Sequence, residues 1–229
     1  MHRRIESAMT MMTDPRHFKL RLFIEGNIIG IATGMVIALF RYLLELSEEY
    51  LPVLYRWLPE HIAWIPVWFL LLAICGWVLY RIVRRDGMTS GSGIPQIKGI
   101  LLGEMDMNWA RVLILKFTGA VLGIGAGMSL GREGPSVQLG ACLGQGLGRL
   151  THRSYAESHY LLTAGAGAGL AAAFNAPLAG VIFCLEELTK NFSAFVLMGA
   201  ISAAVTATTV TQYFFGMQPV FHMGVVPVI

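Results

Sequence analysis

The sequence is poor in charged residues, and this shortage excludes most classes of soluble protein. Asp, Glu, Lys and Arg make up 14% of the 229 residues, whereas 55% are hydrophobic, and the mean hydropathy is +0.61. A soluble globular domain typically has about 25% charged residues. The net charge of +3 is also too small to indicate a nucleic-acid partner. We therefore expect an integral, multi-pass membrane protein that is surrounded by a lipid bilayer.

Cysteine and histidine are scarce in the arrangements that bind metal or form disulfides. The three cysteines, Cys75, Cys142 and Cys184, are scattered through apolar segments without pairing or ligand spacing. The six histidines form no HExxH or similar cluster. A glycine run at residues 165–169 loosely imitates a dinucleotide fingerprint, but no strand pattern precedes it. The sequence therefore predicts no metal site, no cofactor and no enzymatic activity.

Two long apolar segments near the N-terminus predict conventional spanning helices, at residues 22–46 and 64–83. Residues 1–21 are polar and basic, without the apolar core of a signal peptide. Basic residues lie before the first segment and at the end of the second, whereas the loop between them carries only Arg56. Because cytoplasmic segments carry the excess of Lys and Arg, we expect a cytoplasmic N-terminal tail over residues 1–21. A membrane domain is expected over residues 22–229.

Beyond residue 85 the apolar segments become short, glycine-rich and interrupted. Several are shorter than the roughly 20 residues that a spanning helix needs. Such segments are typical of the broken helices of transporters and channels. Glycines at small-xxx-small spacing also allow helices to pack closely in lipid. The segments cover residues 91–102, 112–130, 135–150, 160–174, 177–188 and 195–215.

The stretch Gly131-Arg132-Glu133-Gly134-Pro135 places two charges inside one of the most apolar parts of the chain. Ionisable residues at membrane depth usually line a pathway for ions or protons. Irregular backbone, which glycine and proline indicate here, survives at that depth only where it lines a cavity or is buried in protein. The stretch therefore predicts a transport site with a titratable group. Taken alone, it is also compatible with a plain loop that carries a surface ion pair.

Three stretches share one design, a Gly/Pro turn that begins a short helix. They read GSGIP at residues 91–95, GREGP at 131–135 and FNAPLAG at 174–180. Proline is favoured in the first helical turn, where its missing N–H would have no partner anyway. The remaining free N–H groups and the positive end of the helix dipole form an anion site that faces a cavity. The Ser92 hydroxyl adds an uncharged donor, so that a halide is held moderately and can leave.

These stretches resemble the signature motifs of the CLC family of chloride channels and chloride/proton antiporters. The third is longer than the turn itself and reads AAAFNAPLAGVIFCLEE at residues 171–187. The motifs occur in the family's order and at similar spacing, and the resemblance covers residues 22–215. It implies an all-α fold of tilted and broken helices, the first of the two inverted repeats of the CLC fold. It also implies chloride/proton antiport by a homodimer in a bacterial inner or plasma membrane, with chloride and protons as the transported ions.

The resemblance implies roles for individual residues. Ser92 matches the central-site serine that contacts the anion, and Glu133 matches the gating glutamate, which competes with chloride and carries the proton on the extracellular side. Glu187 matches an internal proton glutamate that family channels usually lack. The candidate anion-binding residues are Ser92, Gly93, Ile94, Gly131, Arg132, Glu133 and Gly134, and the candidate supporting residues are Lys116, Glu186, Pro95 and Pro135.

Several alternatives stay open from the residues alone. Lys116 is equally compatible with snorkelling toward lipid headgroups, and the pair Glu186-Glu187 with a solvated helix end. One departure from the family pattern concerns the internal proton route. Well-studied bacterial members have acidic residues after GSGIP where this chain has Gln96 and Lys98. An acidic partner for Glu187 is therefore either missing or supplied elsewhere.

Two further functions compete with antiport. A gated passive chloride channel would not need the proton acceptor that Glu187 offers. A non-transporting remnant or assembly partner is suggested by length, because the family's membrane domain is about twice as long as this chain. We expect a fragment rather than two copies inserted in opposite orientations, since the basic residues around the first two spans favour one orientation.

Overall fold

The computed structural model describes residues 15–190 and 192–217, and this part of the chain contains helices and no strands. The expected all-α fold is therefore confirmed. The long and medium helices are α2 (Pro15–Trp57), α3 (Ile65–Arg85), α4 (Ile94–Leu102), α5 (Trp109–Gly125), α6 (Glu133–Leu150), α7 (Tyr155–Phe174), α8 (Pro177–Phe183) and α9 (Ala194–Phe215). Short helical turns connect them: η1 (Leu58–Glu60), η2 (Ile62–Trp64), η3 (Gly87–Thr89) and η4 (Cys184–Thr189).

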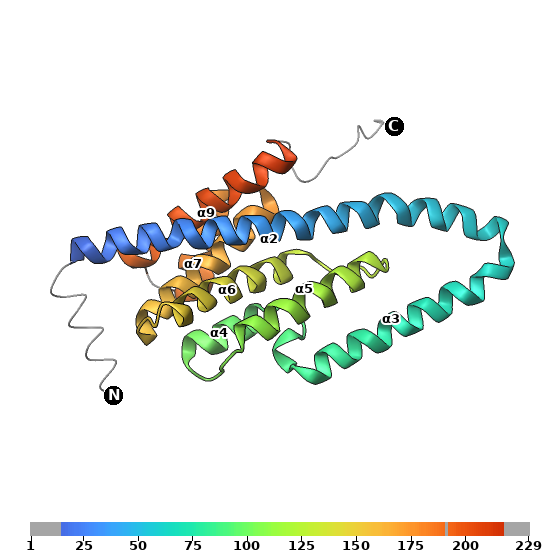
Figure 1. Cartoon of the computed structure of the whole chain (residues 1–229), viewed down its shortest axis with the longest axis horizontal. Helices are drawn as coiled ribbons and strands as arrows, with labels where there is room; N and C mark the ends of the chain where they lie inside the picture. The colour runs from blue at the N-terminus through green and yellow to red at the C-terminus, as the bar shows by residue number, and fades with distance from the viewer. Residues whose placement is uncertain (1–14, 191, 218–229) are drawn as a thin grey trace.

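Helix α2 is longer at both ends than the predicted span at residues 22–46. At 1.5 Å per residue its 43 residues extend about 65 Å, roughly twice the hydrocarbon thickness of a bilayer. It runs along the whole molecule, and α3 returns from its far end (Figure 1). Residues 15–21 of the predicted N-terminal tail are already helical, and Phe18 and Leu22 are buried in a core cluster. Residues 1–14 of that predicted tail lie outside the described residues.

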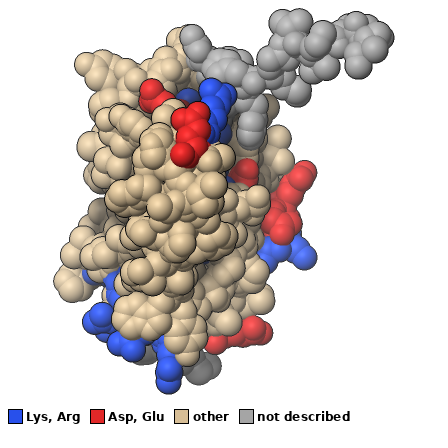
Figure 2. Space-filling model, turned by 90° about the vertical axis from the view of Figure 1, so that its right-hand side faces the viewer, with Lys and Arg blue, Asp and Glu red and all other residues tan. Residues whose placement is uncertain are grey.

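Three segments of the described chain are long and apolar enough to cross a membrane. They are His17–Glu60, Ile62–Arg85 and Ala194–Phe215. No residue of α3 is buried, which suits a helix whose sides face lipid. At the turn between α2 and α3 the rings of Trp57 and Trp64 lie 6.1 Å apart, and aromatic residues of this kind favour the membrane–water interface. The end of the molecule shown in Figure 2 is mostly uncharged, with charged side chains gathered toward its edges.

Helices α6 and α7 form the centre of the fold, because their glycines let the two backbones touch. A Cβ built on Gly140 would overlap the carbonyl oxygen of Gly165, and one built on Gly144 would overlap that of Leu161. Residues 161–169 of α7 are all buried. Helices α2 and α9 pack against α7, with Ile37, Phe40 and other apolar residues in the shared core. The small-residue spacing in α6 therefore allows close helix packing, as expected.

The predicted short segments correspond to α4 through α9, with ends that differ by a few residues. Helix α5 begins at Trp109 because the Asn108 side chain accepts a hydrogen bond from the Arg111 N–H at 3.2 Å. Helix α7 begins at Tyr155, five residues before the predicted start, because Ser154 and Glu157 form a capping box. Both helix starts are marked by one or two polar residues, which a hydropathy profile does not detect.

Candidate functional site

The first two Gly/Pro turns meet at one cavity of about 500 Å³. GSGIP spans the loop before α4 and the start of that helix, and GREGP spans the loop before α6 and the start of that helix. Apolar residues of α3 and α5 close the other sides. The candidate residues that line this cavity are Ser92, Lys116, Gly131, Glu133, Gly134 and Pro135, whereas Gly93, Ile94, Pro95 and Arg132 lie outside its lining.

The turn before α4 depends on two glycines in the left-handed region. Gly91 has φ +58° and Gly93 has φ +90°, and both values disfavour any residue with a side chain. A Cβ at Gly93 would also overlap the side chain of Gln138, whose amide donates to the Met88 carbonyl at 2.6 Å. The Ser92 hydroxyl accepts from the Ile94 N–H at 3.4 Å, which leaves its own hydrogen available as a donor. Ser92 is thereby held at the cavity by backbone geometry.

Helix α6 begins against the Ser92 turn. An ideal Cβ on Gly134 would lie 2.8 Å from the Ser92 Cα, so only glycine allows this approach. The Arg132 side chain gives no cap, and the first turn contains Pro135, which has no N–H. The N–H groups of the first turn have no carbonyl partner within the helix, and their positive end favours an anion.

The Glu133 carboxylate lies in the same cavity. Glu133 is the first residue of α6, and its side chain folds back over Gly131, where it is the nearest group to any Cβ that Gly131 would carry. The residue is half-buried and lines the cavity. The Glu133 carboxylate and the candidate anion-binding groups therefore share one space, in which an ionised carboxylate would repel an anion.

Lys116 supports the cavity wall and does not snorkel. Its side chain is buried, and the ammonium donates to the carbonyl oxygens of Thr89 at 3.1 Å and of Gly91 at 2.6 Å. Both acceptors precede Ser92 in the chain. Lys116 thus ties the middle of α5 to the GSGIP turn.

The third Gly/Pro turn lies apart from the other two. Residues 174–180 do not line this cavity. They make a tight connection between α7 and α8, in which Asn175 has φ +56° and Pro177 begins the new helix. Gln212 of α9 donates to the Asn175 side-chain oxygen at 2.7 Å. With seven residues, α8 is a short piece that leads the chain to Glu186 and Glu187.

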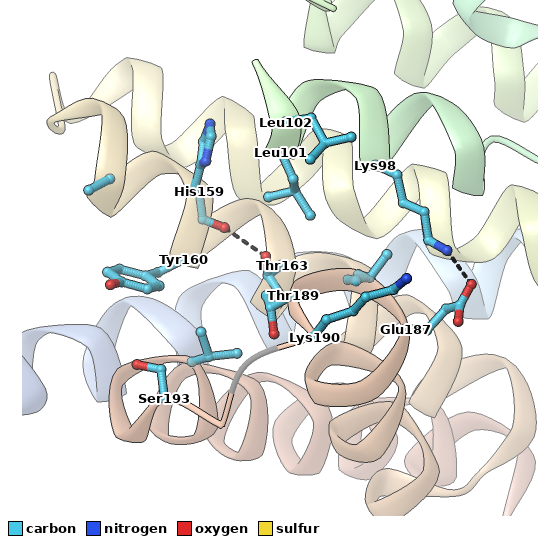
Figure 3. Close-up of a pocket in the computed structure, with 13 residues that line it drawn as sticks. Lys98, Leu101, Leu102, His159, Tyr160, Thr163, Glu187, Thr189, Lys190 and Ser193 are labelled. Atoms are coloured by element: carbon cyan, nitrogen blue, oxygen red, sulfur yellow. Dashed lines mark hydrogen bonds and ion pairs between the residues drawn. The ribbon is translucent and has the colours of Figure 1, made fainter. Parts of the chain in front are cut away.

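Glu187 lines a second cavity of about 470 Å³, which Figure 3 shows. The Lys98 ammonium donates to the Glu187 carboxylate. This hydrogen bond, and then the charge of Lys98, hold the pKa of Glu187 below its usual range. Glu186 is exposed and does not line the cavity. The family pattern implies an acidic residue at position 98. Lys98 instead gives Glu187 a basic partner.

Sequence reasoning did not foresee this ion pair. Lys98 and Glu187 are 89 positions apart, and no periodicity connects them. The single available signal was Lys98 itself, a basic residue at a position where the family resemblance implied an acidic one. The described residues contain no cluster of His, Cys, Asp and Glu that could hold a metal ion.

Comparisons with known proteins show the family to which the chain belongs. The family model for the voltage gated chloride channel matches residues 71–228. The H(+)/Cl(−) exchange transporter ClcA of Cronobacter sakazakii is 43% identical over 171 residues, which are 72% of this chain and 36% of that protein. ClcA of Vibrio cholerae is 37% identical over 204 residues, which are 86% of this chain and 43% of that protein.

Solved structures show the same fold. A slow cyanobacterial Cl−/H+ antiporter superposes with a TM-score of 0.77 at 33% identity, covering 84% of this chain and 46% of that one. A CLC-type fluoride/proton antiporter superposes with a TM-score of 0.71 at 27% identity, covering 92% and 50%. The chain thus spans half or less of the length of these relatives. It is an integral membrane protein, and it belongs to the CLC family of voltage-gated chloride channels, of whose fold it carries the N-terminal portion.

Proposed function

We propose that the protein exchanges chloride against protons, with Glu133 as the gate. The observation that carries this proposal is the single cavity in which the Glu133 carboxylate, the Ser92 hydroxyl and the start of α6 meet. The names of the relatives, which are exchange transporters and antiporters, support the same reaction. Because the chain spans about half of those proteins, the activity belongs to a complete pathway of which these residues form one side.

The gate works by competition between two negative charges. Chloride is held by the free N–H groups at the start of α6 and by the Ser92 hydroxyl, which are uncharged donors that bind moderately and release readily. While Glu133 is ionised, its carboxylate repels an anion from the same space. Protonation removes that repulsion and lets the side chain leave. Entry of chloride then favours the protonated side chain, so that anion and proton movement are linked.

Glu187 supplies a separate position for the proton. It lies in a different cavity from Glu133, so protons and chloride need not share one route on this side of the protein. This separation favours antiport over a gated passive chloride channel, which needs no second carboxylate. No step requires a cofactor, a metal or enzymatic chemistry.

The surroundings of the site complete the proposal. We place the N-terminus in the cytoplasm, in a bacterial inner or plasma membrane, because basic residues flank the first two spans on that side. Residues 22–229 then form one membrane domain, and two copies assemble as a homodimer with one pathway in each subunit. A different class of function is a non-transporting assembly partner of a full-length relative.

A chloride-gradient assay in liposomes with a pH electrode separates these functions. Antiport predicts that a chloride gradient drives protons uphill in the opposite sense. In Glu133→Gln, which mimics the protonated side chain, chloride flux should persist while proton movement disappears. Proton movement that continues in this variant would exclude Glu133 as the gate. Chloride flux without protons in the unmodified protein indicates a passive channel, and no flux of either ion indicates an assembly partner.

A further inference from the structure

The ion pair between Lys98 and Glu187 joins α4 to η4 at the open mouth of the second cavity (Figure 3). One third of the Lys98 side chain and half of the Glu187 side chain are exposed, so the pair lies at the surface of the described chain. In the described part of the chain, Lys98 is the cation in hydrogen-bond contact with this carboxylate. Protonation of Glu187 therefore competes with an existing salt bridge.

The other elements around Glu187 contribute little opposing charge. Helix α7 presents His159 and Tyr160 to the cavity, and α9 together with its preceding residue presents Val196 and Ser193. Helix α8 contains no charged residue. On its own segment, Glu187 has the exposed Glu186 before it and Lys190 after it, and Lys190 adds a smaller attraction.

Lys98 also lies on the helix that carries the anion-site turn. Helix α4 begins two residues after Ser92, and Lys98 is in its second turn. The opposite side of the helix is fixed, because Ile97 and Ile100 are buried in a core cluster with residues of α6 and α7. Because α4 has nine residues and is held in this way, the position of Lys98 at the second cavity is fixed.

We propose that Lys98 is a positioning residue that holds Glu187 as a carboxylate against α4, so that Glu187 takes up a proton only when this ion pair opens. The proposal rests on the proposed function, in which Glu187 carries protons. As a consequence, the Glu187 carboxylate stays deprotonated until the pH of the solution around it falls. Lys98 lies on α4, whose first turn adjoins Ser92, so the proton acceptor and the anion site are connected through one short helix.

A spectroscopic titration tests the ion pair without any transport. The protein, purified in lipid nanodiscs, is titrated by infrared spectroscopy, and the carboxyl signal of Glu187 is isolated by subtracting the Glu187→Gln spectrum. Lys98→Met, which removes the charge and keeps the length, should move the Glu187 titration to higher pH. Lys98→Arg should restore it toward the original value. Lys190→Met, the matched control in the same cavity, should move it less than Lys98→Met.

Two spectroscopic results would overturn the proposal. The Glu187 titration is unchanged in Lys98→Met, or Lys98→Arg shifts it as far as Lys98→Met does, which would show that charge is not the cause. The same variants are then compared in the liposome assay, where Lys98→Met should shift the pH dependence of proton-coupled flux to higher pH. If the unmodified protein moves no protons although the spectroscopic shift is present, the proposed function fails while the ion pair stands. If chloride and proton fluxes are coupled but their pH dependence is the same in Lys98→Met as in the unmodified protein, the inference fails and the proposed function stands.

Discussion

The Lys116 ammonium, buried in α5, donates to the Gly91 carbonyl oxygen at 2.6 Å and so holds the turn that presents Ser92. A second bond goes to the Thr89 carbonyl. A cation beside a proposed anion pathway suggests direct attraction to chloride, but its hydrogen bonds show that it acts on the backbone. Lys116 is therefore part of the wall whose shape places the serine.

Lys116→Met should loosen this turn. Two carbonyl oxygens lose their donor, and an unsatisfied buried acceptor costs about 1–3 kcal/mol. We expect a loss of that size in stability, together with weaker chloride binding, measured by thermal unfolding in detergent and by calorimetric titration with chloride. Arg85→Met, which removes an exposed cation at the end of α3, is the control and should change neither quantity. Unchanged chloride binding in Lys116→Met would show that the turn keeps its shape without the lysine.

Gly134→Ala should separate α6 from the Ser92 turn. The added methyl would overlap the Ser92 backbone, which cannot move aside as a flexible side chain does. Overpacking of this kind costs about 1–3 kcal/mol, which corresponds to chloride binding weaker by about fivefold to a hundredfold. Calorimetric titration with chloride measures the effect.

The control for Gly134→Ala is Gly76→Ala in α3, where no atom lies within 4 Å of the added methyl. It should leave chloride binding unchanged and stabilise α3 slightly, since alanine favours helix more than glycine does. Equal chloride affinity in Gly134→Ala and Gly76→Ala would mean that the close approach of α6 to Ser92 has no role in anion binding.

Local chemistry made much of this arrangement predictable. Gly/Pro turns mark where α4, α6 and α8 begin, and apolar length marks α3 and α9, because both signals act within a few residues. The ends of α2 were less predictable, since burial of Phe18 against residues far along the chain extends that helix. The targets of Lys98 and Lys116 were not predictable from local chemistry. Each is a contact between distant segments that only the packing of α4, α5 and η4 determines.

Glu187→Gln should uncouple the two ions. If Glu187 is the internal proton acceptor, its amide cannot take up a proton, so chloride flux continues while the number of protons moved per chloride falls toward zero. The liposome assay measures both fluxes at once. Glu186→Gln is a matched control, because this neighbouring carboxylate is exposed and lies outside the cavity lining. An unchanged ratio in Glu187→Gln, or an equal loss in Glu186→Gln, would count against the assigned role.

A buried ion pair fixes the start of α2 to the connection between α6 and α7. Glu25 is buried, with 7% of its side chain exposed, and it accepts from the Arg153 guanidinium, which is 22% exposed. Removing one partner of a buried pair leaves an uncompensated charge and costs about 3–5 kcal/mol. By contrast, an exposed pair within one helix contributes about 0.3–0.5 kcal/mol. The loss of stability on substitution therefore distinguishes a buried structural ion pair from an exposed one.

Glu25→Gln should therefore destabilise the protein more than Glu45→Gln, which breaks the pair between Arg41 and Glu45 within α2, because the Glu45 side chain is 39% exposed whereas that of Glu25 is 7% exposed. The double change Glu25→Gln with Arg153→Met should recover part of the loss, because no charge then remains unpaired at the site. Thermal unfolding of the single and double variants gives the coupling between the two residues. Additive losses would show that Glu25 and Arg153 contribute independently, and the ion pair would then not be what anchors α2 to the connection between α6 and α7.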